Sequence, residues 1–285
     1  TLLREFTTTL LKDDYSPRII LNDYQNAGLD IQWFKKQLGS DLTDSLSGSC
    51  ICCDGLNQLR DLLKASPKSQ KPITLIESNG TTDATDLMSH ISIGTGEQYY
   101  PPIQISVVSA KSWQKRGSYN DQEAQQIQSA SLIVISFEDS VDQERMLEVH
   151  QQVRSLNPYA NIIKKSNFSL NDIIEASSES TPITKAKHQE HDKSHWSSCQ
   201  IDMPTGISKD QLTSFLGRIP ESIIRVKGCT KLNDSQVYIY FERYLDGHVD
   251  LKPFPGNPAF GAKLITIGPG SNPELLKQLR DSVLK

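Results

Sequence analysis

The chain has 285 residues, a formal net charge of -4 and a pI near 5.9, a length that suits one large or two ordinary domains. Lys and Arg are scattered singly and the balance is acidic, which excludes the basic stripe of a nucleic-acid binder. The longest apolar runs, such as 132–135, are too short to span a bilayer and no signal peptide is visible, so no membrane partner is expected.

Strand and helix patterns alternate over the first 165 residues. Near-continuous apolar strands separated by helices predict an α/β fold, with a mostly parallel sheet that carries helices on both faces. In that architecture ligands bind beyond the carboxyl ends of the strands. The expected strands are 18–22, 73–77, 103–108, 132–137 and 162–163, and the expected helices are 2–10, 56–63, 122–130 and 141–156.

Polar residues follow four of the expected strands, at positions 22–23, 77–80, 109 and 136–139. Glu77 is followed three residues later by Gly80, a spacing that suits a nucleotide switch. The carboxylate can hold a Mg²⁺-bound water, and the glycine N–H can meet a terminal phosphate. Taken alone, Glu77 also fits an ordinary carboxylate at a strand end.

Three cysteines within four residues, Cys50, Cys52 and Cys53, precede the helix expected over 56–63. The chain cannot easily fold back over one or two residues to give unstrained disulfide geometry. As thiolates, the three sulfurs can fill most of a tetrahedral Zn²⁺ or Cu⁺ shell, and a helix N-terminus favours thiolates. The alternative is small buried residues in a turn. Five cysteines, three of them clustered, fit a reducing, cytoplasmic setting better than a disulfide framework.

The composition turns polar between 171 and 200, which predicts a linker between a domain at 1–170 and a smaller domain at 201–285. His188, His191 and His195 are spaced for one helical face, so the linker offers a weak accessory metal site. A solvated linker without a fixed site is the alternative. Downstream, strands without regular helical crossovers predict an α+β domain with an antiparallel sheet. Its expected elements are a helix around 212–216, strands over 223–226, 237–241 and 263–267, and a helix over 273–284.

Six segments together carry a resemblance to one known family. They are Asn22-Asp23 with Asp30, Ser49-Cys50-Ile51-Cys52-Cys53, Glu77-Ser78-Asn79-Gly80, Gln125-Gln126-Ile127 with Ala130, Leu156-Asn157-Pro158-Tyr159-Ala160, and Arg225-Val226-Lys227-Gly228. The chain resembles the CobW-like GTPases, in the class of P-loop metallochaperones that includes UreG and HypB, over nearly its whole length. The resemblance implies GTP with Mg²⁺ and Zn²⁺ as cofactors.

The resemblance also implies site residues. Glu77 and Gly80 take the catalytic positions, and Cys50, Cys52 and Cys53 take the metal positions. The nucleotide and Mg²⁺ positions fall on Thr1, Asn22, Asp23, Asp30, Ser136 and Asp139. Thr1 stands where the phosphate-binding Walker A loop of the family ends, so the resemblance implies a sequence truncated within that loop. A chain without the loop is expected to bind nucleotide poorly and to be inactive as a GTPase.

Three departures indicate a divergent branch of the family. Ser136-Phe137-Glu138-Asp139 stands where the family has Asn-Lys-x-Asp, which keeps only the Asp and weakens the expected selectivity for guanine. Gln25-Asn26 replaces Gly-Glu, and Ser109 replaces an Asp.

The leading expectation is a GTP-dependent metallochaperone that delivers Zn²⁺ to a client metalloprotein. The alternative is a non-hydrolysing metal-binding or regulatory protein on a degenerate GTPase scaffold. A thiol redox protein is a weaker third interpretation, because no isolated Cys-x-x-Cys pair follows a strand.

Overall fold

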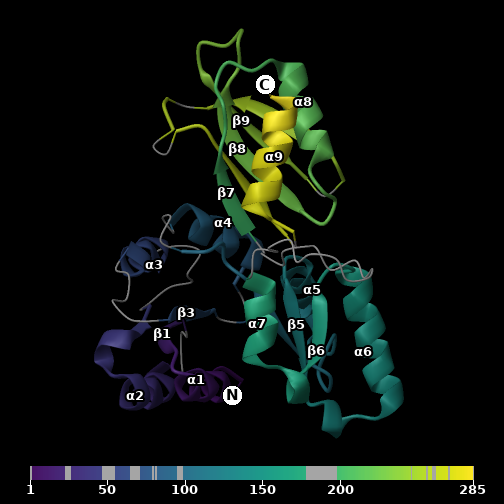
Figure 1. Ribbon diagram of the computed structural model, residues 1–285. Coiled ribbons are helices and arrows are strands. Elements are labelled where there is room, and N and C mark those ends of the chain that lie inside the picture. The colour runs from purple at the N-terminus through teal and green to yellow at the C-terminus, as the bar shows by residue number, and fades with distance from the viewer. Residues whose placement is uncertain are drawn as a thin grey trace, which may run out of the picture. The chain divides into compact units, whose positions relative to one another are not determined.

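The structure is a computed structural model that describes residues 2–22, 27–46, 55–64, 71–78, 80, 82–94, 99–177, 198–244, 246–254, 256–258, 261–268 and 270–284. The chain divides into two compact units. One comprises Thr1–Tyr99 with Phe168–Ile174, and the other comprises Tyr100–Asn167 with Glu175–Lys285. Figure 1 shows the elements of each unit.

The first unit contains a parallel sheet in the order β2-β1-β3. Ile19, Ile20 and Leu21 of β1 are consecutive and almost completely buried, as expected of a strand covered on both faces. Ile19 and Leu21 pack against Phe34 of a helix on one face. The strands are β1 (Ser16–Leu21), β2 (Thr43–Ser45) and β3 (Pro72–Glu77), and the helices are α1 (Leu2–Lys12), α2 (Ala27–Leu38), α3 (Gly55–Lys64) and α4 (Ala84–Gly94).

Arg18, which alternates with Ile19 along β1, reaches the opposite face of this sheet. Its guanidinium donates to the carboxylate of Asp44 in β2 (Nη2 to Oδ2, 2.8 Å) and to the carbonyl of Leu62 in α3 (2.7 Å). Helices therefore cover both faces: α1 and α2 lie on one side of β1 and β3, and α3 lies on the other (Figure 1). The start of α7 (Leu170–Ser177) belongs to this unit, where Leu170 packs with Phe6 and Leu10 of α1.

The second unit contains another parallel sheet, in the order β4-β5-β6. Ile133 and Ile135 of β5 pack against Val149 and Val153, which recur four residues apart on one helix face. The strands are β4 (Ile105–Ser109), β5 (Leu132–Ser136) and β6 (Asn161–Lys164), and the helices are α5 (Asn120–Gln128) and α6 (Gln143–Leu156).

The same unit contains an antiparallel sheet in the order β10-β9-β8-β11-β7, covered on one face by two helices (Figure 1). Gly228 lies inside the sheet at a very close approach of neighbouring strands. A Cβ at this position would lie 2.4 Å from the Phe241 ring and 2.3 Å from the Lys263 carbonyl oxygen. The strands are β7 (Ser198–Asp202), β8 (Arg225–Lys231), β9 (Tyr238–Arg243), β10 (Val249–Pro253) and β11 (Lys263–Ile267), and the helices are α8 (Lys209–Arg218) and α9 (Pro273–Val283).

The predicted fold class is confirmed: parallel sheets flanked by helices are followed by an antiparallel sheet with helices on one face. Strand positions differ in detail. The strand expected over 223–226 begins at Arg225, because the backbone N–H of Ile223 instead closes a turn onto the Pro220 carbonyl (3.1 Å). Within the stretch expected as a linker, residues up to Ser177 belong to α7 and residues from Ser198 belong to β7, while 178–197 lie outside the described residues.

Candidate functional site

The carboxyl ends of β1 and β3 bring two of the predicted site residues together. Leu21 is in register with Glu77, and the backbone N–H of Asn22 donates to the carbonyl of Glu77 (2.9 Å). On the other side of β1, the N–H of Leu46 donates to the carbonyl of Leu21 (2.9 Å). Asn22, Glu77 and the chain leaving β2 at Leu46 therefore meet at one edge of the sheet, where ligands bind in parallel α/β folds.

The side chain of Asn22 is a buried donor at this edge. Asn22 is only 4 % exposed, and its Nδ2 has no hydrogen-bond partner among the residues that the structure describes. A buried amide left unpaired costs about 1–3 kcal/mol. Glu77 is exposed. One buried N–H donor and one exposed carboxylate at the same edge of the sheet fit a ligand that is rich in oxygen and bound with a cation or water.

Gly80 adds open space near the end of β3. Among the described residues, no atom lies within 4 Å of a Cβ built on Gly80, so the space on that side of its backbone suits a close approach of a ligand. The helix that follows begins at Ala84, and Asp83 accepts a hydrogen bond from the N–H of Asp86 (2.9 Å). Gly80 thus lies between the end of β3 at Glu77 and the start of α4 at Ala84.

Asp30 makes an ion pair inside the first unit. Its carboxylate accepts a hydrogen bond from the guanidinium of Arg4, which also lies over the Trp33 ring at 5.2 Å from the centroid. These contacts tie α1 to α2. Sequence reasoning missed Arg4, because its partners lie 26 and 29 positions away and nothing local points to them. A role for Asp30 in nucleotide or Mg²⁺ binding stays a prediction.

The carboxyl ends of β4 and β5 bring a second group of predicted residues together. Ser109 is in register with Ser136, and the Ser136 hydroxyl donates to the carbonyl of Val108 (3.0 Å). Asp139 follows in a short 3-10 turn and is exposed. Between them, Phe137 has left-handed backbone angles (φ 60°, ψ 30°) and is 59 % exposed.

Glu138 fastens this turn to the chain that follows β6. Its carboxylate accepts a hydrogen bond from the backbone N–H of Ser166 (2.9 Å). Partial burial acts to raise the pKa of Glu138, but the hydrogen bonds from Ser166 and the charge of Lys164 outweigh it and hold this pKa below its ordinary value. Glu138 is therefore an ionised structural group of the turn at neutral pH.

The predicted metal ligands Cys50, Cys52 and Cys53 lie outside the described residues, as do Thr1 and Asp23 and the linker histidines His188, His191 and His195. The segment with the cysteines is bounded by Leu46 and by α3, which begins at Gly55. Among the residues that the structure describes, no group of three or more His, Cys, Asp or Glu side chains is placed to hold a metal ion.

The two cysteines of the antiparallel sheet are poor metal ligands. Burial raises the pKa of Cys199 to about 12, and its sulfur lies 3.3 Å from the Thr266 hydroxyl. Burial also raises the pKa of Cys229, whose thiol donates to the carbonyl of Gly261 (3.4 Å). Since metals bind the thiolate form, both sulfurs are disfavoured as ligands near neutral pH.

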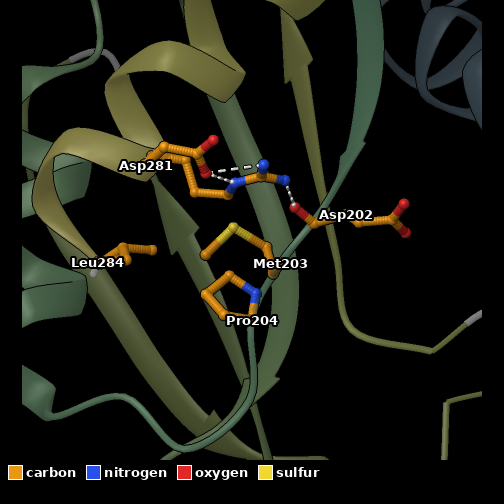
Figure 2. A pocket seen from close by; sticks show the side chains of 6 residues that line it. Asp202, Met203, Pro204, Asp281 and Leu284 are labelled. Carbon is orange, nitrogen blue, oxygen red and sulfur yellow. Dashed lines mark hydrogen bonds and ion pairs between the residues drawn. The ribbon is translucent and has the colours of Figure 1, made fainter.

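A hollow of about 370 Å³ lies between the end of β7 and α9 (Figure 2). Its apolar lining comes from Met203, Pro204 and Leu284. The Arg280 guanidinium at its border donates to the Asp202 carbonyl (2.7 Å) and to the Asp281 carboxylate (2.8 Å). None of the predicted site residues lines this hollow.

Residues 1–164, more than half of the chain, match the family model described as CobW/HypB/UreG, nucleotide-binding domain. The chain belongs to this family. It is also similar to two solved structures, each with 14 % identity and a TM-score of 0.43: the Zn(II)-bound YjiA GTPase from E. coli, and a Zn(II)-bound YjiA triple mutant in which one glutamate and two cysteines are alanine. The alignments cover 98 % and 99 % of this chain, and 95 % and 96 % of those chains. None of the helices in the described part is long and apolar enough to cross a bilayer.

Proposed function

We propose that this protein is a GTP-dependent zinc metallochaperone, which binds Zn²⁺ through Cys50, Cys52 and Cys53 and delivers it to a client metalloprotein. One observation carries the proposal. Asn22 and Glu77 meet at the carboxyl edge of β1 and β3, and the segment with the cysteines begins just after Leu46, which is bonded to the same edge. The chain thus passes the edge that carries residues suited to a nucleotide at Leu46, four residues before the first cysteine suited to a metal.

Each residue at this edge has a distinct task in the proposed reaction. The buried amide of Asn22 donates a hydrogen bond to an oxygen of the nucleotide or its bound water, which satisfies its unpaired Nδ2. The exposed Glu77 carboxylate orients a water, and the glycine at position 80, which has no side chain to block the approach, admits a phosphate oxygen. Bound Mg²⁺ would neutralise charge on the phosphates. Thr1, Asp23 and Asp30 complete the proposed nucleotide and Mg²⁺ set.

The proposed zinc site follows from the chemistry of the cysteines. Burial disfavours thiolates at Cys199 and Cys229, which leaves the three clustered cysteines as the better ligands. Thiolate ligands of this kind require a reducing compartment, so a cytoplasmic location is part of the proposal. His188, His191 and His195 form the accessory site of the proposal.

A second candidate function is a metal-binding or regulatory protein that does not hydrolyse GTP. The observation that favours it is the hydroxyl of Ser136, which donates to the Val108 carbonyl inside the sheet. A side chain held in this way contributes little to reading a base. Glu77 and Gly80 favour the chaperone, because a carboxylate can orient an attacking water and a glycine lets a phosphate come close to the backbone.

Competition with a chromophoric chelator tests the zinc site on the full chain. The unmodified protein is expected to bind about one equivalent of Zn²⁺ tightly, as three thiolates plus a fourth ligand make a tetrahedral site. Replacing Cys50, Cys52 and Cys53 together by Ser should abolish this stoichiometric binding.

The matched control replaces the two buried cysteines, Cys199→Ser with Cys229→Ser, and should leave zinc affinity unchanged. If the triple variant competes for zinc as well as the unmodified protein, the proposed site is wrong. A variant without His188, His191 and His195 then shows whether the linker holds the metal.

A further inference from the structure

The hollow between the end of β7 and α9 is lined by residues that have no task in the proposed function. Its volume of about 370 Å³ is in the range of small-molecule sites. Figure 2 shows the side chains of Met203 and Leu284 pointing toward one another, while the Asp202 side chain points away from both. Every lining residue belongs to the second unit, so the hollow is a feature of that unit alone.

The floor of the hollow is apolar. Met203 and Leu284 are 5 % and 9 % exposed and pack in the core cluster of the antiparallel sheet. Pro204 is held in place, because its carbonyl accepts a hydrogen bond from the Thr230 hydroxyl. A methionine side chain is unbranched and polarisable, so it adapts to apolar groups of different shapes. This floor therefore suits an aliphatic side chain.

One cation and one anion lie side by side at the border of this floor. Arg280 Nε donates to Asp281 Oδ1, and Arg280 Nη2 lies near the same oxygen, both at 2.8 Å. Arg280 Nη1 donates to the Asp202 carbonyl (2.7 Å). These contacts use three of the five N–H groups of a guanidinium, which leaves two without a partner among the residues that the structure describes. The side chains of Arg280 and Asp281 are 20 % and 49 % exposed, so a ligand can reach both.

The paired charges decide which ligand fits. A ligand with a carboxylate alone would meet the charge of Asp281, and a ligand with an ammonium alone would meet that of Arg280. An α-amino acid carries both groups on one carbon. Its carboxylate can accept from Arg280 and its ammonium can donate to Asp281, and charge-assisted hydrogen bonds of this kind are the strong ones. An aliphatic side chain on the same carbon matches the apolar floor.

We propose that the hollow binds a free α-amino acid with an aliphatic side chain of about the size of leucine. Arg280 holds the carboxylate, Asp281 holds the ammonium, and Met203, Pro204 and Leu284 cover the side chain. A peptide terminus offers one of the two charges and is the weaker ligand for this reason. The inference is independent of the zinc proposal, because the hollow is lined by other residues.

NMR of the methionine methyl groups in the full chain tests the proposal. The chain has three methionines: Met203 lines the hollow, Met88 lies on α4 and Met146 lies on α6. L-Leucine should shift the Met203 signal in a saturable way and leave the other two signals in place. Met203→Leu identifies the signal, and a chelator in the buffer prevents leucine from acting through a bound metal. Titrations up to about 10 mM cover the millimolar affinity expected of so small a ligand.

Three analogues of leucine separate the parts of the ligand. Leucinamide lacks the carboxylate, N-acetyl-leucine lacks the ammonium, and glycine lacks the side chain. Each should bind at least about tenfold more weakly than leucine, because it leaves one part of the site unmatched. If leucinamide or N-acetyl-leucine binds as tightly as leucine, the site takes a peptide terminus and the proposed ligand is wrong. Glycine that binds as tightly as leucine would equally contradict it.

Two variants test the charges. Arg280→Gln and Asp281→Asn should each weaken leucine by about 10- to 150-fold, since each removes a charge-assisted hydrogen bond. Asp234→Asn, at an exposed position of the same unit, is the control and should bind leucine like the unmodified protein. Unchanged Met88 and Met146 signals show that a variant is folded. A Met203 signal that leucine does not move, or an unchanged affinity in Arg280→Gln, would overturn the inference, and neither result bears on zinc binding.

Discussion

Single side chains in this protein separate into those that hold the fold and those that remain available to a ligand. Arg4 pairs with Asp30 across α1 and α2 through Nη2. Asn22, in contrast, keeps a buried Nδ2 that lacks a partner within the described residues. Such an uncompensated donor is costly. Arg4, Thr43, Arg60 and Ser89 of the first unit also carry buried polar atoms that lack a partner within the described residues, so what distinguishes Asn22 is its place at the carboxyl edge of β1.

Glu242 shows how one buried charge contributes to stability. It is 7 % exposed and accepts hydrogen bonds from Arg225 Nε and from the Tyr240 hydroxyl, both at 2.8 Å. Burial acts to raise the pKa of Glu242, but the Arg225 and Tyr240 hydrogen bonds and the nearby positive charges outweigh it. The pKa therefore lies below the ordinary 4.5.

Because the folded pKa of Glu242 is depressed, its stabilisation is present above the unfolded pKa and is lost as the pH falls through the folded one. Glu242→Gln should lower the free energy of unfolding near pH 7 by about 1–3 kcal/mol. The difference from the unmodified protein should shrink as the pH falls from about 5 toward 3.

Urea denaturation followed by circular dichroism over this range measures the effect. Asp234→Asn is the control, since Asp234 is exposed in the same unit. If the loss in free energy of unfolding caused by Glu242→Gln is the same at every pH, the charge of Glu242 does not have the role stated.

Helix α8 begins with a capping box. The Ser208 hydroxyl accepts from the N–H of Gln211 (3.0 Å), and the Gln211 side chain accepts from the N–H of Ser208 (2.9 Å). This capping box satisfies two backbone donors that a helix start otherwise leaves unpaired. The cap thereby fixes where α8 begins, and Leu212, Phe215 and Leu216 then reach the core.

Ser208→Ala should destabilise the protein by about 1 kcal/mol, within a range of about 0.5–2, because one cap donor loses its acceptor. Ser214→Ala, on an exposed position inside the same helix, should be neutral or slightly stabilising, since alanine is the better helix former. The measurement is the thermal stability of the two variants, compared with that of the unmodified protein. Equal losses for both would show that the cap bond is not what Ser208 contributes.

Elements with strong patterns were predictable from the sequence, and those with weak patterns were not. The buried run of β5 and the Pro-initiated α9 were expected nearly as they occur. Helix α2 is not among the expected helices, although Ile31, Phe34 and Leu38 stand at helical spacing and pack in one cluster with Trp33. The first three residues of β7 fall inside the stretch predicted as a polar linker, whose end at residue 200 lies within this strand.

The candidate site was predictable to a lesser degree. Sequence order alone indicated that Asn22 and Glu77 follow strands, and the parallel pairing confirms that they meet at one edge. The sequence assigned Phe137 to the end of a strand. In the structure β5 ends at Ser136, and Phe137 adopts left-handed angles. No propensity favours that conformation for phenylalanine, so only the tertiary hydrogen bonds of the turn explain it.

For the whole molecule, the proposed function requires that metal and nucleotide affect each other. In a version extended ahead of Thr1 by the phosphate-binding loop of the family, each ligand should change the affinity of the other by the same factor. A typical coupling of about 1–3 kcal/mol corresponds to about 5- to 150-fold. Glu77→Ala should weaken this coupling, and Cys52→Ser should remove it together with the metal site.

The measurement is the Zn²⁺ affinity with and without a non-hydrolysable GTP analogue. Glu144→Ala, on an exposed position of α6, is the control and should couple like the unmodified protein. Equal zinc affinities in the presence and absence of the analogue would contradict the proposed coupling. The protein would then be a metal-binding protein on a nucleotide-binding fold.

The close approach at Gly228 has a consequence for how the family can vary. The space that a side chain at position 228 would need is occupied by the Phe241 ring and by the backbone of β11. A change at position 228 alone is therefore blocked whatever the chemistry of the new residue, whereas a smaller residue at 241 would relieve only the ring and not the Lys263 carbonyl. Packing alone thus accounts for the glycine of the Arg225-Val226-Lys227-Gly228 segment in this chain, and its presence carries no information about zinc or nucleotide.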